Sequence, residues 1–65
     1  MVMINGKPQE AVGKTMLEIV EEGGFTPSHV AVERNEEIVP KAQYGEVKAL
    51  DGDVIEIVQF VGGGA

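Results

Sequence analysis

The sequence contains no cysteine among its 65 residues. The chain therefore cannot form a disulfide scaffold, a thiolate metal site or a cysteine nucleophile. Any reaction at sulfur would need a thiol from a partner protein. A chain of this length buries only about 60% of the surface that its unfolded form exposes. We therefore expect one small domain with a thin core and no enclosed substrate pocket.

Basic residues are also scarce, because five Lys and Arg stand against eleven Asp and Glu and give a net charge of −6. Phosphate backbones and anionic membranes repel such a chain, so we do not expect it to bind nucleic acid. Proteins with basic surfaces are the expected partners. No segment approaches the roughly 20 apolar residues of a membrane span. The first residues also lack the pattern of a signal peptide. These features predict a cytoplasmic location without membrane association.

Residues 1–12 are predicted to form a β-hairpin. The apolar run Met1–Ile4 is followed by Asn5-Gly6, which is the strongest short-range signal for a two-residue hairpin turn. The second strand is predicted over Lys7–Val12. Pro8 has no N–H to donate, so this strand should lie at the edge of a sheet.

A short amphipathic helix is predicted after the hairpin. Thr15 and Glu18 have the spacing of a capping box, in which each side chain accepts a hydrogen bond from the other residue's backbone N–H. Gly23-Gly24 is expected to end the helix after about two turns. The helix should pack through an apolar stripe and expose its glutamates, and the stripe comprises Met16, Leu17, Ile19 and Val20.

Three further strands are predicted over His29–Arg34, Ile38–Val39 and Val54–Val61. The last is the longest and richest in β-branched residues, so we place it at the centre of the sheet. Within the irregular segment 41–50, Tyr44 and Leu50 are expected to anchor the chain in the core. The predicted class is α+β, with one helix in the concave face of a mixed sheet.

Alternation divides the side chains of the last strand between two faces. Ile55 and Ile57 are predicted to enter the core beneath the helix. Val58 and Phe60 should then be exposed, where an apolar patch often contacts a partner. The alternative, given equal weight, is that Phe60 closes the end of the core.

The chain ends in three glycines and an alanine, directly after the strand predicted to be central. We therefore divide it into a folded body, 1–61, and a flexible tail, 62–65. Glycine has no Cβ, and four extended residues reach about 13 Å. A carboxylate on such a tail could pass through a narrow channel into a partner's active site. A frayed terminus or a residue left by expression is the competing interpretation.

The whole chain resembles the ThiS family of sulfur carriers in thiazole formation for thiamine biosynthesis. The resemblance rests on the order of the elements and on three segments, namely Asn35–Pro40, Asp51–Ile57 and Phe60–Gly64. It implies a ubiquitin-like β-grasp fold with about five strands around one main helix. None of the three segments is specific alone, but their combination in this order is.

The resemblance also implies a chemistry. A ThiF-type enzyme would use ATP to adenylate the C-terminal glycine, and a cysteine desulfurase or another persulfide donor would supply sulfur. The resulting thiocarboxylate would deliver sulfur to thiazole synthase (ThiG). By position, Gly64 would carry the thiocarboxylate, with Gly63 beside it. The carrier itself would be a protein co-substrate and not an enzyme, would bind no cofactor or metal, and would be monomeric when free.

Ala65 departs from the Gly-Gly end of that family. It could be removed by proteolysis, be a residue added for expression, or carry the reactive carboxylate itself. We expect Gly64 to be the functional end. Val58 and Phe60 are predicted to dock the partners, together with Gly62 and Gly63 of the tail.

Other polar residues are expected to be solvated. His29 is predicted to be an exposed residue at the start of a strand, and the acidic pairs Glu21-Glu22 and Glu36-Glu37 should lie on the surface, where they can steer the chain towards basic grooves. Arg34 is expected to pair with these surface acids. Asp51–Asp53 resembles part of a calcium loop, but the rest of that pattern is missing, so a turn is predicted.

Other functions fit the same tail. The chain could carry sulfur for molybdopterin or cysteine synthesis. It could instead be a ubiquitin-like modifier that is joined to lysines, or an interaction module with an inert tail.

Overall fold

The computed structural model describes residues 1–60, and it begins with the predicted hairpin of β1 (Val2–Ile4) and β2 (Lys7–Gln9). Asn5 and Gly6 have φ values of 50° and 83°, as a two-residue turn requires. β2 is an edge strand, which confirms the interpretation of Pro8. The second strand ends at Gln9, so the predicted extension to Val12 is wrong.

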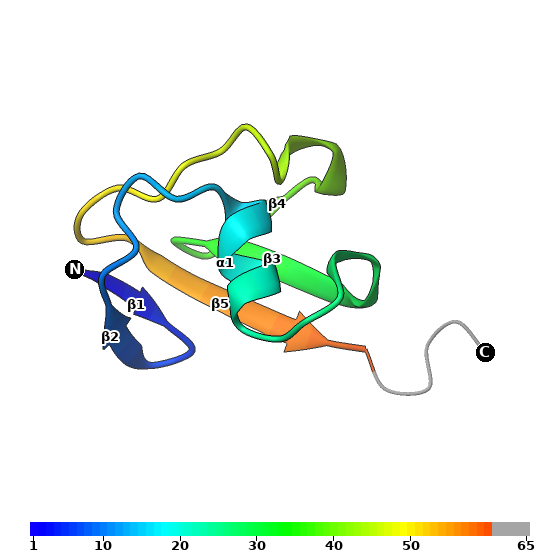
Figure 1. Ribbon diagram of the computed structural model, residues 1–65, viewed down its shortest axis with the longest axis horizontal. Coiled ribbons are helices and arrows are strands. Elements are labelled where there is room, and N and C mark those ends of the chain that lie inside the picture. Colours follow the sequence, from blue (N-terminus) through cyan, green and yellow to red (C-terminus); the bar gives the residue numbers. More distant parts are fainter. Residues whose placement is uncertain (61–65) are drawn as a thin grey trace.

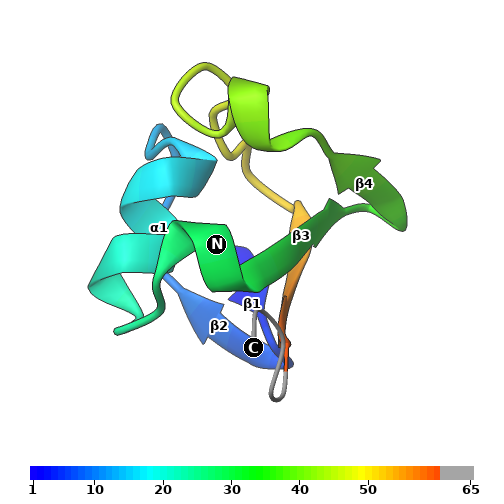
Figure 2. The same ribbon diagram turned by 90° about the vertical axis from the view of Figure 1, so that its right-hand side faces the viewer.

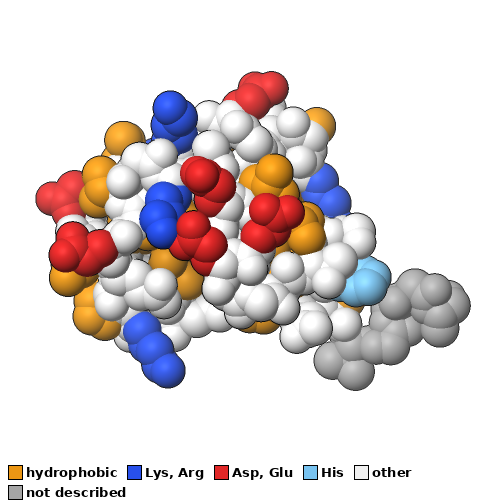
Figure 3. Space-filling model, viewed as in Figure 1, with side chains coloured by type: hydrophobic (Ala, Val, Ile, Leu, Met, Phe, Trp, Pro, Cys, Tyr) orange, Lys and Arg blue, Asp and Glu red, His pale blue; other side chains and the backbone are white. Residues whose placement is uncertain are grey.

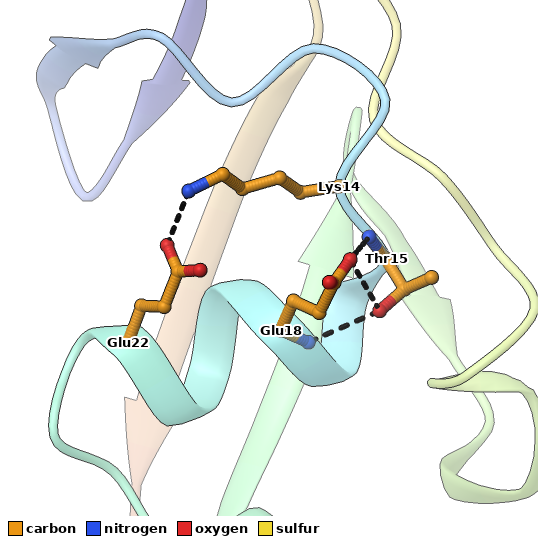
Figure 4. A network of polar contacts seen from close by, with 4 residues as sticks. All are labelled: Lys14, Thr15, Glu18 and Glu22. Carbon is orange, nitrogen blue, oxygen red and sulfur yellow. Dashed lines mark hydrogen bonds and ion pairs between the residues drawn. The ribbon is translucent and has the colours of Figure 1, made fainter.

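Helix α1 (Met16–Glu22) begins at the predicted capping box, shown in Figure 4. The Glu18 N–H donates to Thr15 Oγ1 at 3.1 Å, and the Thr15 N–H donates to the Glu18 carboxylate at 2.9 Å. The helix ends where Gly24 takes a φ of 84°. There the N–H groups of Gly24 and Phe25 donate to the last helical carbonyls, which confirms the predicted glycine stop.

The sheet continues with β3 (Val30–Arg34), β4 (Glu37–Val39) and β5 (Val54–Gln59). The strand order is β2-β1-β5-β3-β4, so β5 is central as predicted. It runs parallel to β1 and antiparallel to β3, which makes the sheet mixed. The described part of β5 ends at Gln59, and Val61, the predicted last residue of that strand, lies outside the described residues.

Two short 3₁₀ helices connect these elements, η1 (Pro27–His29) and η2 (Lys41–Gln43). The His29 N–H donates to the Thr26 carbonyl at 2.8 Å and closes the turn of η1. For this reason β3 begins at Val30 and not at His29 as predicted. His29 itself is exposed, as expected.

The core lies between α1 and the sheet, which Figures 1 and 2 show as two layers. Ile55 and Ile57 are buried, with 0% and 7% of their surface exposed, and this confirms the predicted inward face of β5. Tyr44 is buried as predicted. The remaining core residues are apolar and come from β1, α1, β3, β4 and the connecting segments: Val2, Ile4, Ala11, Met16, Ile19, Val20, Val30, Val32, Val39 and Ala49.

The prediction for Leu50 is wrong, because 58% of its surface is exposed. Its neighbour Ala49 is fully buried and exchanges hydrogen bonds with the backbone of residues 13 and 14. Successive side chains of an extended segment point to opposite sides. With Ala49 turned inward, Leu50 has to face the solvent.

Within residues 1–60, all of α1 lies on one face of the sheet. Figure 2 shows α1 on one side of the strands and none of the described elements packed on the other. Among residues 1–60, no helix is long and apolar enough to cross a membrane.

Candidate functional site at the end of β5

The strand that leads to the glycine segment is fixed at its beginning by Asp53, whose carboxylate is buried. This carboxylate accepts hydrogen bonds from Arg34 Nε and the Leu50 N–H, both at 2.8 Å, and from Asn35 Nδ2 at 3.1 Å. Asn35 Oδ1 in turn accepts from the Val54 N–H at 2.9 Å. The start of β5 is thereby tied to the turn between β3 and β4.

Two opposing effects act on the pKa of Asp53. Burial raises it, but the hydrogen bonds from Arg34, Leu50 and Asn35 favour the charged form and together hold the pKa below its ordinary value. Asp53 is therefore a charged structural residue at neutral pH. The sequence pattern around Asp53 predicted only a turn.

The predicted pairing of Arg34 with the surface glutamates is wrong. The partner of Arg34 is Asp53, at 2.8 Å. The reason is the register between β3 and β5, which places Arg34 opposite Ile55 and close to the residue that begins the strand. The glutamates at positions 21, 22, 36 and 37 are exposed, as predicted. Figure 3 shows acidic side chains gathered over α1.

The middle of β5 is held from the side of β1. Strand pairing with β1 covers only Val54 and Ile55. Beyond that point the Asn5 side chain takes the place of a strand, because its Oδ1 accepts from the Ile57 N–H at 2.7 Å and its Nδ2 donates to the Ile57 carbonyl at 3.4 Å. The hairpin turn thus supports β5 as well as closing the first hairpin.

The far end of β5 is exposed. Val58 and Phe60 have 52% and 50% of their surface accessible, and neither belongs to the buried core. The predicted exposure of both residues is confirmed, and the alternative that Phe60 closes the core is not. Their role in docking stays a prediction.

Phe60 is nevertheless held in place. Its N–H donates to the His29 carbonyl at 2.9 Å. Lys41 Nζ lies 5.5 Å from the centre of the Phe60 ring and donates to the Ser28 carbonyl at 3.0 Å. A cation at this distance over an aromatic ring is attracted to it. Lys41 was not predicted from the sequence pattern, because only the fold brings η2 beside the last described residue.

The other predicted site residues, Gly62, Gly63, Gly64 and Ala65, lie outside the described residues. The proposed boundary between a body and a tail at residue 62 falls there too. Within residues 1–60, no group of three or more His, Asp or Glu side chains could hold a metal ion. The exposed side chains of Val58 and Phe60 are apolar and carry no reactive group.

A cleft of about 400 Å³ lies between the first hairpin and the C-terminal end of α1. Its lining combines apolar residues such as Ile19 and Ile57 with the ion pair of Lys14 and Glu22, whose atoms approach to 2.5 Å (Figure 4). The charged residues of the lining are Lys7, Glu10, Lys14 and Glu22.

The comparison with known families agrees with this arrangement of elements. A model described as the ThiS family matches residues 2–64. The chain belongs to the ThiS family. The family predicted from the sequence, and with it the ubiquitin-like β-grasp fold, is therefore confirmed.

Relatives of this ThiS-family chain include separate carriers and parts of larger proteins. It is 41% identical over 64 residues to the sulfur carrier protein ThiS of Thermus thermophilus, and the match covers 98% of this chain and 100% of that protein. It is 45% identical over 64 residues to a thiazole synthase of Magnetococcus marinus, where the match covers 97% of this chain. The chain spans only 20% of the length of that thiazole synthase.

Solved structures agree on the fold. The crystal structure of a thiamine biosynthesis protein (ThiS) from Geobacter metallireducens superposes with a TM-score of 0.79 at 28% identity, and the match covers 97% of each chain. The solution structure of a Geobacter metallireducens thiamine biosynthesis protein gives a TM-score of 0.73, with 98% of this chain and 87% of that one covered.

Proposed function

We propose that this ThiS-family chain is a sulfur carrier for thiazole formation in thiamine biosynthesis. One observation carries the proposal, namely the match over the whole length of the Thermus thermophilus sulfur carrier protein. The names of the relatives favour this pathway over molybdopterin or cysteine synthesis. We further propose that the chain acts in the cytoplasm, as a monomer when it is not bound to a partner.

The proposed reactive group is the carboxylate of Gly64, after removal of Ala65. A carboxylate is a poor electrophile, so a ThiF-type enzyme would convert it to an acyl adenylate with ATP and release pyrophosphate. A persulfide donor such as a cysteine desulfurase would attack the acyl carbon, and AMP would leave. A thiol would then reduce the acyl disulfide and free the thiocarboxylate, which thiazole synthase would use.

The folded body supports this proposal by what it supplies and what it lacks. In the sequence, three glycines follow β5 closely, and the described part of the chain leading to them is held by Asp53, Asn5 and the His29 carbonyl. A tethered acyl group needs such positioning more than it needs catalytic side chains. In this proposal the chain is a co-substrate, binds no cofactor itself, and docks its partners through Val58, Phe60 and the glycines at 62 and 63.

The test is intact-mass analysis of a chain that ends at Gly64, after incubation with the ThiF-type enzyme, ATP, a persulfide donor and a reducing thiol. We expect replacement of one oxygen by one sulfur. A variant truncated after Phe60 keeps every described contact and serves as the control, which should gain no sulfur. The proposal fails if the chain that ends at Gly64 gains no sulfur or if the truncated variant gains it equally.

Two experiments in cells distinguish the other interpretations. A ladder of heavier conjugates in cell lysate would favour a ubiquitin-like modifier. Normal growth without thiamine in cells that carry only the truncated variant would favour a module with an inert tail.

A further inference from the structure

Two asparagine side chains hold β5, one from the side of β1 and one from the side of β3. Asn5 lies in the turn between β1 and β2, and its carboxamide bonds to the N–H and the carbonyl of Ile57 at 2.7 and 3.4 Å. Asn35 lies in the turn between β3 and β4, and its carboxamide bonds to the Val54 N–H at 2.9 Å and to the Asp53 carboxylate at 3.1 Å. Both asparagines are exposed, and their φ values of 50° and 53° are left-handed.

The two asparagines differ in the residue that follows, which is Gly6 after Asn5 and Glu36 after Asn35. The backbone nitrogen of the next residue can attack the side-chain amide carbon of an asparagine and close a five-membered ring. A side chain on that next residue hinders the attack, and glycine has none. Within residues 1–60, the Gly6 N–H makes no hydrogen bond to the backbone, and a Cβ placed on Gly6 would meet nothing within 4 Å beyond its chain neighbours. The Gly6 nitrogen is therefore available for the reaction.

We propose that Asn5 is a site of spontaneous deamidation in the folded chain, with solvent water as the co-reactant. The Gly6 nitrogen forms a bond to Asn5 Cγ, and the bond between Cγ and Nδ2 breaks. Nδ2 leaves as ammonia and takes with it the proton that the Gly6 N–H loses. Water then opens the cyclic imide at one of its two carbonyls, which leaves aspartate or isoaspartate at position 5. This chemistry is independent of the sulfur carrier function proposed above.

The fold controls the rate of this reaction through Ile57. The leaving atom, Asn5 Nδ2, donates to the Ile57 carbonyl, and Oδ1 accepts from the Ile57 N–H. The ring closes only when the carboxamide turns its face towards the Gly6 nitrogen, and a carboxamide that is bonded at both ends resists that rotation. The folded chain should therefore lose this amide more slowly than the unfolded chain.

Deamidation would weaken the support of β5 beyond its short pairing with β1, which ends at Ile55. Aspartate still accepts from the Ile57 N–H, but an oxygen without a proton then faces the Ile57 carbonyl in place of Nδ2. Isoaspartate lengthens the backbone of a two-residue turn, which the paired strands of a tight hairpin do not accommodate. Both products should be less stable than the unmodified chain, and both add one negative charge.

The test is a timed incubation of the full chain in mildly alkaline buffer at body temperature, folded in one sample and unfolded by guanidinium chloride in the other. Cleavage after lysine and arginine separates the two asparagines into different peptides. Mass spectrometry then follows the exchange of an amino group for a hydroxyl in each peptide. Asn35 is the internal control, because it has the same exposure and backbone conformation in the same molecule.

We expect Asn5 to lose its amide in the folded chain while Asn35 keeps its own. Asn5 should react about ten-fold more slowly in the folded sample than in the unfolded one, as two hydrogen bonds on the carboxamide imply. An isoaspartyl methyltransferase should label the product. Ion exchange separates the product by its added charge, and its unfolding temperature should lie below that of the unmodified chain. Asn5→Asp supplies the aspartate product alone, and its unfolding temperature should also be lower.

Three results would overturn the proposal. The first is an intact Asn5 amide in the folded chain after an incubation that extends well beyond complete reaction of the unfolded chain. The second is equal loss of amide at Asn35, since the following glycine would then be irrelevant. The third is an equal rate at Asn5 in the folded and unfolded samples, which would show that the bonds to Ile57 do not control the reaction.

Discussion

The two ends of β5 are built in opposite ways. At the beginning, the buried carboxylate of Asp53 accepts three hydrogen bonds, from Arg34, Asn35 and the Leu50 backbone. At the other end, the Phe60 N–H donates one hydrogen bond to the His29 carbonyl, and 50% of the surface of Phe60 is exposed to solvent. The strand therefore begins at a buried carboxylate with three hydrogen bonds and leads to an exposed apolar surface.

The difference separates stability from presentation. Hydrogen bonds to a buried charge fix the register of the strand, because a shift by one residue would leave that charge unpaired. The exposed end contributes little to the core and leaves apolar area free for a partner. Substitutions at the first end should therefore affect folding, and substitutions at the second should affect binding.

The largest effect is expected for Asp53→Ala. The change leaves Arg34, Asn35 and the Leu50 N–H without their common acceptor, and we expect the free energy of unfolding to fall by about 3 kcal/mol. Urea unfolding measures it. Asp51→Ala is the matched control, because Asp51 is exposed and its ion pair among residues 1–60 is with the N-terminal amine. Equal stability of the two variants would show that the anchor does not stabilise the fold.

A smaller effect is expected from pH, again at the first end. The pKa of Asp53 is lower in the folded chain than its ordinary value. A depressed pKa stabilises the fold fully above the unfolded value of about 3.9, and this contribution is lost as the pH falls through the folded pKa.

The stability difference between wild type and Asp53→Ala should therefore be constant near neutral pH and shrink in acid. Urea unfolding of both proteins between neutral and acidic pH measures it. Because Glu18 and Asp51 also have lowered pKa values, only this difference isolates Asp53. A difference that grows in acid would contradict the assignment of the charge.

The smallest effect on stability is expected at the open end. Phe60→Ala removes a half-exposed ring and its contact with Lys41, and should lower the free energy of unfolding by no more than about 1 kcal/mol. Affinity for thiazole synthase and for the ThiF-type enzyme should fall far more. Calorimetry measures both affinities.

Lys41→Met is the companion variant for the open end. It keeps an unbranched side chain over the ring but removes the charge and the hydrogen bond to the Ser28 carbonyl. It should weaken binding less than Phe60→Ala does. Normal affinity of a folded Phe60→Ala protein would show that Phe60 does not dock these partners.

Local patterns predicted the parts of the fold that depend on neighbouring residues. Asn5-Gly6 predicted its hairpin and Thr15 with Glu18 the start of α1, because the groups that interact are at most a few residues apart. Alternation predicted which residues of β5 are buried, and therefore the exposure of Val58 and Phe60. The predictions for residues 62–65 stay predictions.

Contacts between distant segments were not predictable in this way. Leu50 was expected in the core and lies outside, because Ala49 bonds to a backbone far along the chain. Arg34 was expected among surface acids and pairs with Asp53, 19 residues away. Lys41 beside Phe60 follows the same rule.

The sequence by itself determined the order of the elements, their local start and stop signals, and the membership in the ThiS family. These depend on short-range hydrogen bonds, side-chain periodicity and the residues along the chain. Only the tertiary structure decided that Asp53 anchors β5 and that the Asn5 side chain bonds to Ile57. Both depend on strand register, which is set when separate segments pack into one sheet and cannot be deduced from either segment alone.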